Sequence, residues 1–174
     1  MDRISPGKSV ALVIIDMQER FRGSYEDIDK EWNGPVSVIN RMSDRFRELG
    51  RPVILLRMEG ACAGHPWDGP RTDVFVDELH TADSDIVITK PHMSGFRDTD
   101  LAERLRELGC DAIVICGTLT NMCVMNTYFS AYDHDFLPYL LRNGTICNDY
   151  EINKAAEKVC STVTFDHVSE YISG

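Results

Sequence analysis

Four runs of consecutive apolar residues divide the first two thirds of this chain. They cover residues 10–15, 53–56, 86–88 and 112–115 of the 174 in the sequence. An unbroken apolar run differs from the alternating pattern of a strand with one wet face, and it is typical of a strand covered on both sides. The runs therefore predict strands of a parallel sheet with helices packed on both faces.

The segments between these runs have helical spacing. Apolar residues recur at helical intervals over 36–49 and 101–108, and these segments stop at Gly50 and Gly109. Helices that end in glycine and lead into strands predict right-handed crossovers. The expected fold is α/β, with three α/β/α layers and a doubly wound parallel sheet. The pattern continues with an expected helix over 121–132, a strand over 136–141, a helix over 152–160 and a last strand over 163–165.

Composition and charge narrow the possible functions. The chain is 43% hydrophobic, which suits one domain over residues 1–174, and its 18 Lys and Arg against 28 Asp and Glu give a net charge of −10. The basic residues form no stripe, so neither nucleic acid nor a membrane is an expected partner. The sequence has no apolar run of membrane-span length, and its six cysteines do not resemble a disulfide framework. The expected location is a reducing cytoplasm.

The segment over residues 59–73 lacks any usable periodicity. It is rich in glycine and proline and contains Trp67. Because ligands of open α/β sheets bind outside the carboxyl ends of the strands, a loop there could cover a site. An ordinary surface excursion is the alternative interpretation, and the sequence leaves both open.

Cys123 follows the fourth apolar run, after a polar turn and where a helix is expected to begin. The positive end of a helix dipole and its free N–H groups can lower the pKa of a thiol and hold an oxyanion. The alternative is that Cys123 is a small buried apolar residue, which is the commoner fate of a free cysteine.

Two further chemical groups stand at ends of the predicted strands. Asp16 closes the first apolar run and Lys90 follows the third. With Cys123, both are expected at one edge of a parallel sheet, where the carboxylate could accept the thiol proton and the ammonium could favour anionic intermediates. Taken singly, the aspartate could be a helix cap and the lysine a solvated side chain. Their joint position predicts a nucleophilic site without histidine.

Three segments together resemble the signature segments of the isochorismatase-like cysteine hydrolases. They are residues 11–18 (ALVIIDMQ), 90–96 (KPHMSGF) and 117–124 (GTLTNMCV), in the family's order across nearly the whole domain. The resemblance implies a catalytic triad of Asp16, Lys90 and Cys123 and a six-stranded, Rossmann-like parallel sheet. It also implies a cis peptide at Thr118–Leu119 and an oxyanion hole made by the backbone N–H groups of Leu119 and Cys123.

The same resemblance implies hydrolysis of a small-molecule amide or ureido substrate through a thioester on Cys123. N-carbamoylsarcosine amidase-like activity is the nearest named possibility, because isochorismatases proper do not use a cysteine at this position. No cofactor is expected, and relatives are commonly homo-oligomers.

The metal motif of the related nicotinamidases is replaced here. Their Asp-x-His after the second strand reads Arg57-Met58-Glu59 in this chain, so no metal is expected. Glu59 with His65 could form at most a weak site. Arg57 could pair with a substrate carboxylate or form an ion pair within the protein.

Aromatic residues near these segments are candidates for the walls of a substrate pocket. They are Phe21, Trp67, Phe96 and Tyr128, and each could equally belong to the core. His92 lies close to Lys90 and could position it, but it is not expected to act as the acid or base.

Two other functions fit the same residues. A redox-active thiol protein would use Cys123 with Cys116 or Cys160 as a resolving thiol, although Cys116 lies within a predicted buried strand. A non-catalytic scaffold could retain the fold without the reaction.

Overall fold

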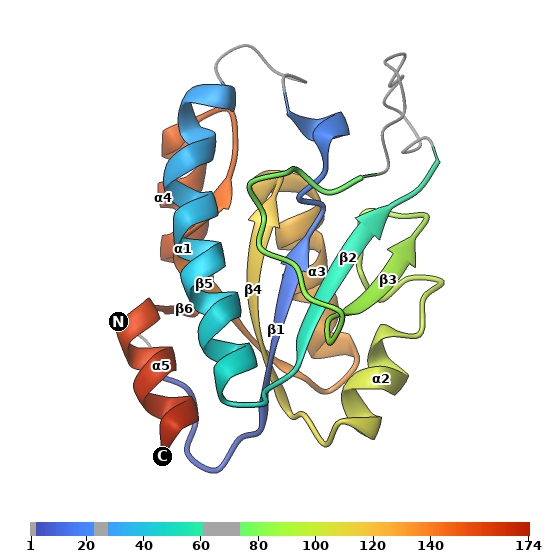
Figure 1. The fold of residues 1–174 in the computed structure, drawn as a ribbon, viewed down its shortest axis with the longest axis vertical. Coiled ribbons are helices and arrows are strands. Elements are labelled where there is room, and N and C mark those ends of the chain that lie inside the picture. The colour runs from blue at the N-terminus through green and yellow to red at the C-terminus, as the bar shows by residue number, and fades with distance from the viewer. Residues whose placement is uncertain (1–2, 23–27, 61–73) are drawn as a thin grey trace.

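Six strands form one all-parallel sheet in the order β3-β2-β1-β4-β5-β6 (Figure 1). The computed structural model describes residues 3–22, 28–60 and 74–174. The predicted parallel sheet of six strands is confirmed. Its strands are β1 (Val10–Ile15), β2 (Val53–Met58), β3 (Ile86–Lys90), β4 (Ala112–Thr118), β5 (Leu137–Ile146) and β6 (Thr162–Val163).

Helices cover both faces of the sheet and complete the three layers. One hydrophobic core lies between the sheet and α1 and α5, and the second lies between the sheet and α2, α3 and α4 (Figure 1). Among the described residues, none of the helices is long and apolar enough to cross a membrane. The helices are α1 (Ile28–Glu48), α2 (Leu101–Glu107), α3 (Met125–Asp133), α4 (Tyr150–Val159) and α5 (Phe165–Ser173), with short turns η1 (Glu19–Phe21) and η2 (Thr120–Val124).

The apolar runs underestimate the strands at their carboxyl ends. β2, β3 and β4 continue to Met58, Lys90 and Thr118, because polar residues there still pair with the neighbouring strand. β5 extends to Ile146, past the irregular register between β4 and β5. Helix α1 begins before its internal Pro35, and α5 is a helix that the periodicity analysis did not predict.

The strand order creates a switch point between β1 and β4. The chain moves outward from β1 to β2 and β3, then crosses back to β4 and continues outward to β5 and β6. At such a point the connections leave in opposite directions, which opens a crevice outside the carboxyl ends of the two strands. Asp16 follows β1 and Cys123 follows β4, so the fold brings both residues to this crevice.

Candidate active site

Asp16 is held in an unusual backbone conformation immediately after β1. Its φ of 50° lies in the left-handed region, and its N–H donates to the carbonyl of Leu56 on β2 at 3.0 Å. A non-glycine residue in this region carries a conformational cost that the surrounding structure must offset. The turn places the carboxylate of Asp16 inside the protein, with no exposed surface.

Lys90 reaches Asp16 across an intervening strand. It is the last residue of β3, which is separated from β1 by β2, so the two backbones lie two strand spacings apart, about 9–10 Å. The long lysine stem spans this gap and brings Nζ to 2.8 Å from Asp16 Oδ2, with both side chains fully buried. A short side chain at this position could not make that contact.

Cys123 joins this pair from the other side of the switch point. It lies in the π-helical turn η2, just before α3, and is 5% exposed. The charges of Asp16 and Lys90 both act on its thiol, so the three side chains lie close together. The structure therefore brings together the three residues that the strand ends predicted.

The electrostatic environment of Cys123 differs from the sequence prediction. Burial raises the pKa of the thiol well above its usual value, and the neighbouring Asp16 charge raises it further, while Lys90 acts in the opposite direction. The prediction that a helix N-terminus lowers this pKa is wrong for the free protein, because burial outweighs the stabilising groups. The resting sulfur is thus a thiol that needs a base.

Asp16 is suited to be that base. Burial raises the pKa of its carboxyl above the ordinary value, and Lys90 limits the rise. A carboxylate with a raised pKa binds a proton more tightly than an exposed one, so proton transfer from a thiol becomes less unfavourable.

The turn between β4 and the nucleophile has the predicted cis peptide. It lies at Thr118–Leu119, and this expectation is confirmed. Gly117 precedes it with a φ of 113°, and a Cβ at this residue would lie 2.1 Å from the carbonyl oxygen of Ile15. Only glycine allows β4 to approach β1 so closely at the edge where Asp16 emerges.

The aromatic candidates do not gather at one place. Phe21 is buried in the same core cluster as Cys123 and remains a candidate for the pocket wall. The placement of Phe96 in the pocket wall is corrected. Its ring stacks on His134 and Phe136, just before β5 and toward the amino end of the sheet. Trp67 lies outside the described residues.

Tyr128 is also a correction to the predicted pocket wall. It is 2% exposed, and its hydroxyl accepts a 2.7 Å hydrogen bond from the N–H of Ser161, the residue before β6. Helix α3 runs away from the carboxyl edge, and this hydrogen bond ties the side chain to the start of β6 at the amino end of the sheet. Burial also raises the pKa of Tyr128.

Arg57 forms an ion pair within the protein. Its Nη2 lies 3.1 Å from Glu59 Oε1 and also donates to Thr89 Oγ1 at 3.2 Å. The described part of the chain has no cluster of three or more His, Cys, Asp or Glu side chains able to hold a metal. The pairing of Glu59 with His65 is not tested, because His65 lies outside the described residues.

The two cysteines considered as resolving thiols lie elsewhere. Cys116 is fully buried in the core on the α1 side of the sheet, whereas Cys123 belongs to the opposite core. Cys160 precedes β6 at the amino end of the sheet, and burial raises its pKa to about 11. Neither position favours the redox alternative, since a resolving thiol must reach the reactive sulfur.

Gln18 and Arg20 are structural parts of the site that the sequence analysis did not single out. The amide of Gln18 accepts from the N–H of Met58 at 2.8 Å and donates to the Met58 carbonyl at 3.1 Å. Arg20 donates to the carbonyls of Met58 and Gly60. Both side chains fasten the segment after Asp16 to the end of β2. The position of Gln18 in the Asp-Met-Gln segment was the available signal.

The fold and the site define a three-layer α/β protein with a carboxylate, an ammonium and a thiol at the switch point of its sheet. The family model described as Isochorismatase domain matches residues 10–163. The chain therefore belongs to the isochorismatase family, and the resemblance drawn from the three segments is confirmed.

Similar proteins include a curated relative at 35% identity. This is the isochorismatase family protein YecD of Escherichia coli O157:H7, aligned over 146 residues that cover 74% of this chain and 75% of that protein. Ureidoacrylate amidohydrolase RutB of Pseudomonas savastanoi pv. phaseolicola is 29% identical, covering 82% and 72% of the two chains. The solved structure of Pyrococcus horikoshii pyrazinamidase in complex with zinc has a TM-score of 0.74 and 27% identity, covering 90% of this chain and 99% of that one.

Proposed function

We propose that this protein is a cysteine-dependent hydrolase that cleaves a carbon–nitrogen bond of a small amide or N-carbamoyl compound. The observation that carries the proposal is the fully buried contact between the Lys90 ammonium and the Asp16 carboxyl, whose pKa is raised, beside the buried thiol of Cys123. Such a set can generate a nucleophile on demand and then return the proton to a leaving amine.

The reaction begins with proton transfer from Cys123 to Asp16 as the sulfur attacks the substrate carbonyl. The new carbon–sulfur bond produces a tetrahedral oxyanion, which the backbone N–H groups of Leu119 and Cys123 stabilise. Lys90 adds positive charge beside the reacting groups. When the carbon–nitrogen bond breaks, Asp16 gives its proton to the departing nitrogen and a thioester remains.

Water completes the cycle. Asp16, again a carboxylate, accepts a proton from a water molecule as its oxygen attacks the thioester carbonyl. The carbon–sulfur bond breaks, and the proton on Asp16 returns to the sulfur. This scheme needs no metal or organic cofactor, and each proton leaves from and returns to a named atom.

The relatives favour a ureido or amide substrate. One relative is named ureidoacrylate amidohydrolase and another is a pyrazinamidase. N-carbamoylsarcosine amidase-like activity fits the same bond type. The pyrazinamidase structure holds zinc. In this chain, Arg57 and Glu59 stand where the Asp-x-His metal motif is expected, and they form an ion pair with each other.

Ammonia release across a panel of small amides and ureido acids tests the proposal. Wild-type protein should release ammonia from at least one member, and Cys123→Ser and Asp16→Asn should reduce the rate by about a thousandfold. Equal release by wild type and variants would reject the mechanism. Mass spectrometry of a quenched reaction should show an acyl group on Cys123, and its mass would identify the acyl half of the substrate.

A further inference from the structure

The ammonium of Lys90 depends on the turn that follows β3. Besides its contact with Asp16, Nζ donates to the carbonyl of His92 at 3.0 Å and approaches that of Met93 at 3.4 Å. Residues 91–98 form neither helix nor strand, so no regular ladder fixes these two carbonyls. Whatever holds this turn therefore also aims the ammonium at Asp16.

The later half of the turn is anchored to the helix that follows the nucleophile. The N–H of Gly95 donates to Thr127 Oγ1 of α3 at 2.9 Å, and Ser94 Oγ donates to Ser130 Oγ at 3.0 Å. A Cβ on Gly95 would lie 2.4 Å from a methyl carbon of Leu56, so the backbone is packed tightly here. This half is fixed by buried contacts.

The early half, which carries the two carbonyls, is held by a contact across the turn. His92 Nε2 lies 2.8 Å from Asp98 Oδ2, and the Arg97 guanidinium lies 3.9 Å from the same oxygen. Asp98 has a φ of 54°, so the backbone is bent into the left-handed region where it presents its carboxylate. Aspartate and asparagine tolerate this conformation better than other side chains with a Cβ.

We propose that His92 and Asp98 are positioning residues for Lys90, and that their contact closes the turn so that the two carbonyls aim the ammonium at Asp16 and Cys123. This proposal deepens the proposed function and rests on it for its catalytic consequence. Neither residue exchanges a proton with substrate. The contact serves geometry, because an exposed pair of this kind adds little to stability and its loss leaves the protein folded.

Three variants separate positioning from charge. Asp98→Gly removes the carboxylate and relieves the left-handed backbone, and His92→Phe keeps a ring without its nitrogen atoms. Asp98→Asn preserves an oxygen that accepts from His92 and also tolerates the left-handed backbone. Two measurements report whether the Lys90 ammonium is displaced, and one of them needs no substrate.

The substrate-free readout is the pH dependence of Cys123 alkylation by iodoacetamide, followed by mass spectrometry of the Cys123 peptide. Because Lys90 favours the thiolate, a displaced ammonium should move the alkylation midpoint to higher pH. We expect this movement in Asp98→Gly and His92→Phe, and a midpoint close to wild type in Asp98→Asn. The second readout is turnover, where kcat should fall about tenfold with little change in KM.

The outcomes are distinguishable. An unchanged midpoint in both Asp98→Gly and His92→Phe overturns the proposal, and so does a movement in Asp98→Asn as large as that in Asp98→Gly. The expected midpoint shifts without turnover by any form, wild type included, would reject the proposed hydrolase while supporting the positioning of Lys90. If one variant fails to fold, the other still decides the result.

Discussion

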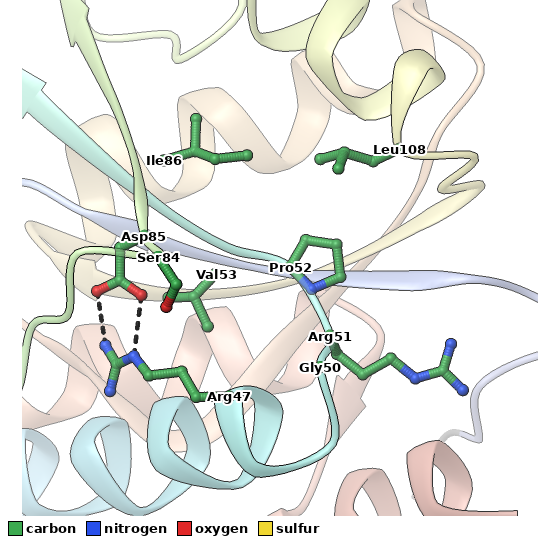
Figure 2. Close-up of a pocket in the computed structure, with 9 residues that line it drawn as sticks. All are labelled: Arg47, Gly50, Arg51, Pro52, Val53, Ser84, Asp85, Ile86 and Leu108. Carbon is green, nitrogen blue, oxygen red and sulfur yellow. Dashed lines mark hydrogen bonds and ion pairs between the residues drawn. The ribbon is translucent and has the colours of Figure 1, made fainter.

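Two ion pairs, one partly buried and one fully buried, lie at opposite ends of the sheet strands and use their hydrogen-bonding atoms differently. At the amino edge, Arg47 of α1 meets Asp85 through two parallel contacts, Nε–Oδ1 at 2.9 Å and Nη2–Oδ2 at 2.8 Å (Figure 2). Arg47 also donates to Ser43 and to the carbonyl of His80, and Asp85 accepts from the N–H of Ala82. The donors and acceptors of this pair are used in fixed geometry.

The pair at the carboxyl edge uses much less of its hydrogen-bonding capacity. Asp16 contacts Lys90 at 2.8 Å, yet within the described residues neither of its carboxylate oxygens has a well-aligned hydrogen bond. Burial raises the pKa of this carboxyl. A saturated ion pair fixes structure, whereas a buried pair with spare capacity can exchange a proton with a neighbour such as Cys123.

Removing the cation from the carboxyl-edge pair should give the largest effect. In Lys90→Met the buried Asp16 loses its compensating charge, takes up a proton and can no longer act as the base. We expect ammonia release to fall about a thousandfold and the free energy of unfolding to fall by about 3 kcal/mol, because Asp16 must bind a proton at neutral pH to remain buried without its cation.

The measurements are steady-state turnover on the best amide substrate and urea unfolding of the same samples. Retention of the full wild-type rate would show that the ammonium takes no part in the reaction. A large loss of stability without loss of turnover would reverse the roles assigned to the two edges.

The equivalent change at the amino edge should act on stability alone. Arg47→Met leaves Asp85, whose side chain is 1% exposed, without its bidentate partner. We expect a loss of about 3 kcal/mol in unfolding free energy, with turnover per folded molecule unchanged. The matched control is Asp44→Ala, which removes a half-exposed partner of the same arginine and should cost less than about 1 kcal/mol.

The fold was largely predictable because its strands and helices have distinct patterns of apolar residues. Unbroken apolar runs marked the strands, and glycines after helical segments marked the turns into them. Two errors have local causes. The Gly34-Pro35 pair disguised the early start of α1, and the two-residue β6 left little signal before α5, although Thr164 caps that helix and Phe165, Val168 and Ile172 share a face.

The site was predictable in its members but not in its environment. Parallel topology alone places Asp16, Lys90 and Cys123 at one edge, whatever the details of packing. The pKa of Cys123 depends on how deeply its neighbours bury it, which no spacing encodes. Phe96 and Tyr128 were predicted to line the pocket because they lie near the motifs in the sequence. Proximity in sequence does not show toward which end of the sheet a side chain packs, and both side chains pack toward the amino end.

Gln18 tests whether the role of a buried polar group depends on how many of its hydrogen bonds are made or on which end of the sheet it occupies. It lies at the carboxyl edge like Asp16, but both ends of its amide bond the backbone of Met58. Gln18→Ala should therefore behave like the amino-edge variant and lose about 2 kcal/mol in urea unfolding, because two buried backbone groups lose their partner. The surface variant Arg104→Ala should stay within about 0.5 kcal/mol of wild type. Equal stability of both would contradict the distinction.

The smallest predicted effect concerns the protonation of the nucleophile. The folded-state pKa of the Cys123 thiol is raised well above its value of 9.0, so the unfolded chain releases this proton at lower pH than the native protein. The stabilisation is therefore complete below pH 9 and is lost as pH rises toward the folded value. Between pH 8 and pH 10, wild type should lose about 1.4 kcal/mol more unfolding free energy than Cys123→Ala, in reducing urea titrations. Cys110, Cys116 and Cys160, whose pKa values burial also raises, are present in both proteins and cancel from the difference. Parallel pH curves would mean that Cys123 titrates alike in the folded and unfolded chains, which would remove the need for Asp16 as its base.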